Sequence, residues 1–285
     1  MMKTKKWMWG LGILVIFVSC EKEYSEENAG TPDALIVGLD CRINKIVYTD
    51  TATKSGIGSL EAAINSLDFV TKITKYDSLS STIEFISTPT YISDTIYINP
   101  DEYFIADINK RITKLHGLLD PTDPFSLQFD VLYVYNGTGY LVRKNYFLSI
   151  SPTFLYYQVN YTYNLGNLTH MSGTDQLSGD LIVDADVGYY NNIVPKRYLY
   201  IFPDEKGYPY FNQFFNYGSK NYNAVKKITV RNYDPGNVVR DSTVSNFSNY
   251  IMSRDTYVLS VQMAGDDQQS IPASAGKLSF SYKCK

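Results

Sequence analysis

Histidine and cysteine are the side chains of this sequence best suited to catalysis or metal binding, and they are few. The chain has two histidines and three cysteines. His116 and His170 lie far apart in the sequence, and an isolated histidine is most often a hydrogen-bonded structural residue. No Cys-His signature, Gly-x-Ser-x-Gly elbow or Walker loop occurs. We therefore predict a protein that is not an enzyme and that has no catalytic residue, metal or cofactor.

Three carboxylates, at Asp180, Asp184 and Asp186, lie close together in the sequence. On a strand, Asp184 and Asp186 share a face and offer oxygens to calcium. Calcium takes about six to eight oxygen ligands, and the others are not evident, so we favour solvated carboxylates. A dispersed pair of acids such as Asp180 and Asp204 leaves a carboxylate-dependent hydrolase as a remote alternative.

Cys20 has a different chemistry, because it closes an apolar run. Lysines at positions 3, 5 and 6 precede an uncharged stretch from Trp7 to Ser19, which is shorter than the about 20 residues that cross a bilayer. The pattern resembles a bacterial lipoprotein signal. This resemblance implies that residues 1–19 are removed and that Cys20, lipidated, becomes the first residue of a membrane-anchored mature chain.

The residues after Cys20 are acidic, with glutamates at 21, 23, 26 and 27. They resemble the export tether of Bacteroidetes-type surface lipoproteins. This implies an outer-membrane, lipid-anchored protein that is exposed at the cell surface. Residues 20–34 contain too few apolar groups to pack, and we interpret them as a flexible tether.

Two cysteines remain after lipidation, Cys41 and Cys284. Disulfides persist in exported proteins, and this one would close a loop of about 240 residues, which stabilises by roughly 5 kcal/mol in the chain-entropy model. Cys284 also falls on the alternating face of Leu278 and Phe280, where a free thiol would be buried. A Cys41–Cys284 disulfide and two separate buried thiols both stay open.

The candidate recognition segment is 188–222, where aromatic residues alternate with asparagines. Aromatic faces stack on sugar rings and amides fix sugar hydroxyls, so this composition suits a glycan. The alternative is that the rings fill or cap a sheet. The candidate binding residues are Tyr189, Tyr190, Tyr208, Tyr210, Phe211 and Tyr217.

Composition limits the partners. Removal of residues 1–19 takes away three lysines and no carboxylate, which changes the net charge from −3 to −6. No basic patch is evident, and we expect no nucleic-acid binding. The 26 tyrosines suit sheets that have one dry and one wet face.

The elements that must hold these residues are strands. The residues of 159–163 and 277–283 alternate between apolar and polar, which is typical of antiparallel sheet. We predict one all-β domain over 35–285, an antiparallel meander of hairpins forming a barrel-like or strongly curved sheet with at most one short helix. The spacing of apolar residues predicts that helix over Ser59 to Leu67.

Similar turns recur along the chain. Tyr163 to Leu168 and Tyr233 to Val238 both read aromatic, Asx, any residue, Gly, Asn, aliphatic, and looser versions follow Tyr76, Ala106 and Tyr135. These hairpins resemble YD-type repeats. Together with Cys20, residues 41–43 and residues 281–284, the chain resembles Bacteroidetes lipoproteins of unknown function with a porin-like fold. That resemblance implies a barrel-like meander and no known activity.

We do not expect the chain to span a membrane as a porin. Membrane barrels carry an outward apolar band, whereas Thr229 and Arg231 lie opposite Ile228 and Val230. The sequence favours a lipid-anchored protein that binds a glycan or a surface protein without catalysis. The alternative is a structural accessory subunit of an outer-membrane or surface assembly, whose sheet edges a neighbour covers.

Overall fold

The computed structural model describes residues 41–50, 56–77, 83–118, 127–196, 199–204, 211–265 and 276–284. These residues form one antiparallel sheet of 17 strands and one short 3-10 helix, η1 (Phe211–Phe214). The strands are β1 (Cys41–Asp50), β2 (Gly56–Ile64), β3 (Val70–Asp77), β4 (Ile83–Ser87), β5 (Thr90–Ile92), β6 (Thr95–Asn99), β7 (Glu102–Ala106), β8 (Ile112–Leu118), β9 (Gln128–Tyr135), β10 (Leu141–Leu148), β11 (Ser151–Asn164), β12 (Asn167–Asp175), β13 (Leu181–Tyr189), β14 (Val225–Asp234), β15 (Val238–Met252), β16 (Val258–Gly265) and β17 (Gly276–Cys284). The proposed leader, the tether and Cys20 lie outside the described residues.

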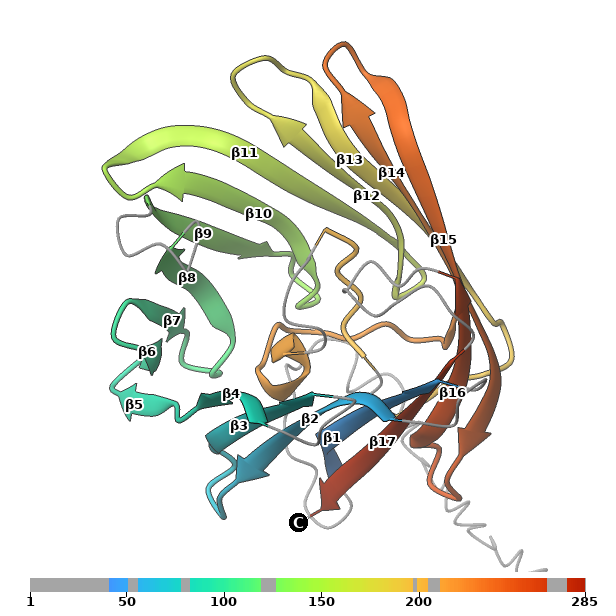
Figure 1. The fold of residues 1–285 in the computed structure, drawn as a ribbon. Helices are drawn as coiled ribbons and strands as arrows, with labels where there is room; N and C mark the ends of the chain where they lie inside the picture. Colours follow the sequence, from blue (N-terminus) through green and yellow to red (C-terminus); the bar gives the residue numbers. More distant parts are fainter. Residues whose placement is uncertain are drawn as a thin grey trace, which may run out of the picture.

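The sheet curves round until its first and last strands meet (Figure 1). Among the described residues, each strand pairs with the next, except that Thr88 and Pro89 separate β4 from β5 and no ladder joins those two strands. Proline has no N–H to donate to a ladder, which suits this break. The predicted all-β antiparallel meander is confirmed, as a strongly curved sheet that is not fully closed.

Alternation decides which side chains face inward. In β17, Leu278 and Phe280 are buried, whereas the alternate residues Lys277 and Ser279 are partly exposed. The inward residues of the other strands join the same apolar core, from Ile46 in β1 to Val261 in β16. Successive side chains of a strand point to opposite faces, so the pattern of the sequence maps directly onto inside and outside.

The two ends of the curved sheet are distinct. The near end is where β1 begins at Cys41, and it also holds Cys284 and the turns 65–69, 93–94, 107–111, 136–140, 164–167 and 253–257. The far end holds the turns 100–101, 149–150, 176–180 and 235–237. In Figure 1 the C-terminus lies at the bottom, and the far-end hairpins β12–β13 and β14–β15 reach the top.

Four near-end turns share one hydrogen-bonding pattern. The amide of the first residue donates to the carbonyl four residues on, and its side-chain oxygen accepts from that residue's amide at 2.9–3.0 Å; these first residues are Asn65, Asp107, Asn136 and Ser253. The fourth residue of each turn has a positive φ, at Asp68, Lys110, Gly139 and Thr256. An Asx or serine side chain that folds back on its own turn explains why these residue types begin the hairpins.

The predicted helix over Ser59 to Leu67 is wrong, because residues Gly56–Ile64 form β2. Leu60, Ala62 and Ile64 are buried, as a period of two requires. The apolar residues of this stretch fit both periods. The segment is short, and ladders to β1 and β3 bind its backbone on both sides, so pairing outweighs a weak helical preference.

The two turns with matching sequences differ in structure. Asn164 pairs directly with Asn167, and both intervening residues, Leu165 and Gly166, have positive φ. Proline cannot adopt positive φ, and the turn that contains Pro235 is one residue longer, since Asp234 pairs with Val238. The first turn lies at the near end and the second at the far end.

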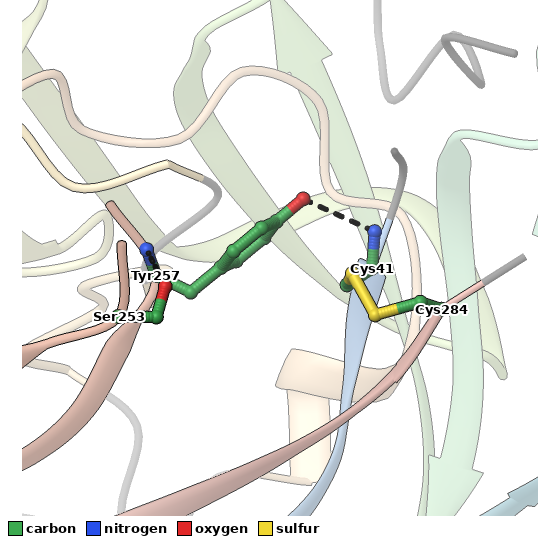
Figure 2. Close-up of a disulfide and its surroundings, with 4 residues drawn as sticks. All are labelled: Cys41, Ser253, Tyr257 and Cys284. Atoms are coloured by element: carbon green, nitrogen blue, oxygen red, sulfur yellow. Dashed lines mark hydrogen bonds between the residues drawn. A yellow bond between two sulfur atoms is a disulfide. The ribbon is translucent and has the colours of Figure 1, made fainter. Parts of the chain in front are cut away.

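Cys41 and Cys284 form a disulfide that joins β1 to β17 across 243 residues of sequence. The Cys41 amide donates to the Tyr257 hydroxyl at 3.1 Å, and the Tyr257 amide donates to Ser253 Oγ at 3.0 Å (Figure 2). The 253–257 turn is thereby tied to the seam where the sheet meets itself.

The connection from β13 to β14 runs inside the curve of the sheet (Figure 1). We call it the inner segment; its described residues are 190–196, 199–204 and 211–224. Its buried apolar residues belong to the same core as the inward faces of the strands, and they include Leu199, Tyr200, Phe202, Phe214, Phe215 and Tyr217. Residues of the inner segment therefore occupy part of the interior of the sheet.

Candidate functional site

A buried ion pair fastens the inner segment to the wall of the sheet. The Lys144 ammonium, on β10, lies 3.1 Å from the Asp204 carboxylate, and both side chains are almost completely buried. The Tyr161 hydroxyl, on β11, donates to the other carboxylate oxygen at 2.5 Å. The ammonium also lies 4.6 Å from the centre of the Phe202 ring. Charges this deep persist only when paired and hydrogen-bonded, so Asp204 has a fixed place inside the wall.

Lys144 was not predicted as a site residue. A register shift between Leu141 and Arg143 places Lys144 on the inward face with Tyr146. Simple alternation from the buried Leu141 would place Lys144 on the outer face, because one extra residue in a strand reverses the side on which the next side chains point. Asp204 was considered only as a dispersed acid, and the structure gives it a lysine partner.

The predicted glycan-binding residues are used in packing where they are described. Tyr217 is 1% exposed and lies among the rings of Tyr133, Tyr200 and Phe202. The Tyr190 hydroxyl donates to the Phe247 carbonyl at 2.9 Å. The neighbouring strand residue Tyr189 is partly buried, and burial raises its pKa well above the ordinary value.

The other candidates of this set add no described ring. Tyr208 and Tyr210 lie outside the described residues. Phe211 begins η1, and only its backbone is described. Most described rings of the segment thus pack inside the sheet, which was the alternative to an exposed glycan face, whereas Tyr222 is 49% exposed.

The end of the inner segment passes along the near-end turns. The Ser219 amide donates to Gly139 O at 2.9 Å, and the Tyr222 amide donates to Gly166 O at 3.0 Å. The approach at Gly218 is so close that a Cβ there would lie 2.1 Å from Gly139 O, and Gly218 also has a positive φ. Only glycine fits such a position.

Asparagine side chains make further hydrogen bonds between the inner segment and the near end of the sheet. The Asn223 amide donates to Asn167 Oδ1 at 2.7 Å, and Asn167 Nδ2 donates to Asn223 Oδ1 at 2.8 Å. The Leu168 amide donates to Asn221 Oδ1 at 2.7 Å, and Asn216 Nδ2 donates to Asn109 O at 3.2 Å. Of the asparagines predicted to fix sugar hydroxyls, Asn216 and Asn221 bond to the backbone in and beside the turns of the sheet.

Two of the three predicted acids, Asp184 and Asp186, lie on the outer face and are held by arginine, whereas Asp180 lies in the 176–180 turn. Arg231 on β14 contacts Asp184 at 2.7 Å and Asp186 at 2.6 Å, and His170 Nδ1 lies 2.9 Å from Asp186. Partial burial acts to raise the pKa of Asp186, but hydrogen bonds from Arg231 and His170 outweigh it and lower the pKa. Hydrogen bonds to Asp186 and then Asp184 raise the pKa of Arg231. This arrangement is a charge network rather than two solvated acids.

His116 occupies a similar outer position. Its Nδ1 lies 2.8 Å from Asp130, which also contacts Lys114 at 3.0 Å, and its ring stacks on Tyr103 at 4.8 Å. Asp130 therefore has two cationic or donor neighbours across the β8–β9 ladder. Within the described ranges, no group of three or more His, Cys, Asp or Glu side chains is placed to hold a metal ion.

Two solved structures share this architecture at low sequence identity. A porin-like protein from Bacteroides uniformis ATCC 8492 matches with a TM-score of 0.57 and 10% identity, over 85% of this chain and 98% of that chain. A porin-like protein from Bacteroides vulgatus ATCC 8482 matches with a TM-score of 0.50 and 13% identity, over 86% of this chain and 99% of that chain. The chain therefore has a porin-like fold, as the sequence resemblance implied.

The likeness extends to the fold and no further. No family model matches the chain, and no curated protein matches it. In the part of the chain that the structure describes, no helix is long and apolar enough to cross a membrane.

Proposed function

We propose that this chain is an exported, lipid-anchored protein without catalytic activity, which binds a partner protein through the far end of its sheet. The observation that carries the proposal is that the inner segment packs inside the sheet while apolar side chains stand exposed at the far end. Recognition is then a matter of the outer surface.

The far-end patch consists of five exposed apolar residues on adjacent hairpins: Phe154, Leu177, Ile182, Val238 and Val239. Leu177 is 71% exposed and Val238 is 61% exposed. Hydrogen bonds from the Gln176 amide to Tyr156 O at 2.8 Å and from the Leu181 amide to Asn237 Oδ1 at 2.7 Å hold these hairpins side by side. Exposed apolar groups that gather on neighbouring elements are typical of an interface, whereas scattered ones are not.

The charges around the far-end patch define the partner's chemistry. Asp180 lies in one of the far-end turns, Asp175 and Asp234 end the strands that lead into them, and Arg240 contacts Asp234 at 3.9 Å. A partner with an apolar centre and basic residues at its rim would complement this end, because charge complementarity favours the correct partner and speeds encounter.

The outer face supports an anchored rather than a membrane-spanning protein. Outward residues of β11 to β14 are mainly polar or charged, namely Gln158, Asn160, Thr162, His170, Ser172, Asp184, Asp186, Thr229 and Arg231. A membrane barrel needs an apolar band at these positions. The disulfide suits an exported protein, since oxidising compartments preserve such bonds.

The test is site-specific cross-linking in cells. A photoreactive residue replaces Leu177 or Val239, and the matched control replaces Thr162, which is exposed on the outer face of β11. We expect one discrete adduct with another protein from positions 177 and 239 and none from 162. The proposal fails if no adduct forms, if position 162 gives the same adduct, or if every adduct contains only two copies of this chain.

A glycan array distinguishes a glycan ligand from a protein partner. The chain that begins at residue 20 is applied with and without the paired substitutions Leu177→Ser and Val239→Ser. Glycan binding that both proteins show equally would favour a glycan ligand over a partner at the far end.

A further inference from the structure

The near end carries a second set of exposed apolar side chains, which lie in its turns or directly beside them. Leu67, Ile92, Ile108 and Leu165 are 69%, 60%, 97% and 88% exposed. Gly, Asn, Asp and Ser ordinarily occupy such positions, because they adopt turn geometry or hydrogen-bond to the turn. Large aliphatic residues in several turns of one end need a reason other than turn formation.

Contacts between neighbouring turns hold these side chains at one edge. Arg42 contacts Asp68 at 3.3 Å, the Phe69 and Tyr91 ring centres are 4.6 Å apart, and the Lys110 ammonium lies 3.8 Å from the centre of the Phe69 ring. The inner segment then bridges the turns at 107–111, 136–140 and 164–167 through residues 216–223, as described above. Leu67, Ile92, Ile108 and Leu165 therefore lie along one edge whose turns contact each other or the inner segment, and we call these four residues and their turns the near-end rim.

Lysines accompany the rim, each over an aromatic ring. Beside Lys110, the ammonium groups of Lys196, Lys220 and Lys226 lie 5.4, 4.8 and 5.8 Å from the ring centres of Tyr257, Tyr200 and Tyr190. Among the described carboxylates of this end, Asp68 and Asp107 contact Arg42 and Arg111, and Asp94 and Asp255 are exposed. Lysines that lie over aromatic rings beside exposed apolar side chains are typical of residues that meet a lipid interface.

We propose that the near-end rim docks onto the surface of an anionic lipid bilayer, with Leu67, Ile92, Ile108 and Leu165 entering the headgroup region. The orientation rests on the proposed lipid anchor: β1 begins at this end, and only about 20 residues separate Cys41 from Cys20. A stretch of that length reaches at most roughly 70 Å, and because β1 starts at the near end, this is the end of the domain at which the connection to Cys20 begins. The far-end patch then points away from the lipid, toward the partner.

Tryptophan fluorescence offers a direct test, because both tryptophans of the sequence, Trp7 and Trp9, precede residue 20. The chain from residue 20, with Cys20→Ser, contains every described strand and both paired cysteines, and it carries no acyl chain. Single variants Ile108→Trp and Leu165→Trp report on the rim, and Leu177→Trp is the matched control at the far end. The probe is phosphatidylcholine vesicles containing phosphatidylglycerol.

We expect a blue shift on vesicle addition for tryptophan at positions 108 and 165 and none at position 177. In vesicle co-sedimentation, the affinity of the Ile108→Ser/Leu165→Ser variant for vesicles should be lower than that of the parent by about tenfold or more, because two aliphatic side chains no longer enter the lipid interface. The Leu177→Ser/Val239→Ser variant should co-sediment as the parent does. Added salt should weaken binding, as attraction of lysines to anionic lipid requires.

Absence of a shift at positions 108 and 165, or an equal shift at position 177, would overturn the docking rim. Binding of a second copy or of another protein at the rim, with no shift on vesicles, would overturn it too. The anchor is tested separately by mass spectrometry of the N-terminal peptide from cells. An unacylated N-terminus would overturn the anchor, whereas the fluorescence shifts would still support the rim.

Discussion

Lys144 places a positive charge inside the sheet, where Asp204 is its partner. Lysine is rarely buried, because removing an ammonium group from water costs several kcal/mol. The carboxylate repays part of this cost, and the Tyr161 hydroxyl satisfies the second carboxylate oxygen. The pair thus specifies how the inner segment sits against β10 and β11, in addition to whatever stability it contributes.

Lys144→Met should destabilise the protein by about 3–5 kcal/mol, because it leaves the Asp204 carboxylate buried without its cation. Adding Asp204→Asn should recover part of the loss by removing that charge. Denaturant unfolding of the oxidised protein measures both, with Lys110→Met at the exposed rim as the control. A Lys144→Met variant as stable as the control would contradict the role of the pair.

At the scale of elements, the inner segment is seated by amide side chains rather than by strand pairing. Asn221 accepts the buried Leu168 amide at the start of β12, and Asn223 and Asn167 bond reciprocally. Four of the near-end turns are capped internally by an Asx or serine side chain. The turns therefore present a preformed edge on which the segment rests.

Asn221→Ala should cost about 1–3 kcal/mol, because the Leu168 amide remains buried without an acceptor. Faster hydrogen exchange should be confined to the 164–168 turn and the adjacent inner segment. The exposed Asn192→Ala variant is the control, with an expected effect within about 0.5 kcal/mol. Uniform faster exchange over the whole sheet would show that Asn221 supports the global fold instead.

At the scale of the whole molecule, the disulfide and the β1–β17 ladder hold the ends of the meander together. Every other described ladder joins strands that follow one another in the chain, so the seam is the ladder that brings the first and last strands of the sheet together. Bringing together two strand ends that are 243 residues apart costs conformational entropy. A covalent bond at this place is effective because it removes that entropy from the unfolded state in advance.

Replacing Cys41 and Cys284 by serine should lower the free energy of unfolding by about 2–5 kcal/mol, the chain-entropy model giving roughly 5 for a loop of this length. Urea unfolding of the variant should match that of the reduced parent protein. An unchanged midpoint in both would show that the ladder closes the sheet without the bond.

The sequence by itself determined the antiparallel strands, the Asx-initiated hairpins and the class of fold, because the period of two and the turn chemistry are local properties of the backbone. It misassigned residues 59–67, where two periods fit equally well, and it left the cysteine pairing open. Only the tertiary structure decided that the aromatic segment turns inward and that Lys144 meets Asp204. Those contacts join residues about 60 positions apart, as in the Lys144–Asp204 bond, and they depend on strand register, which one extra residue reverses and which local patterns do not record.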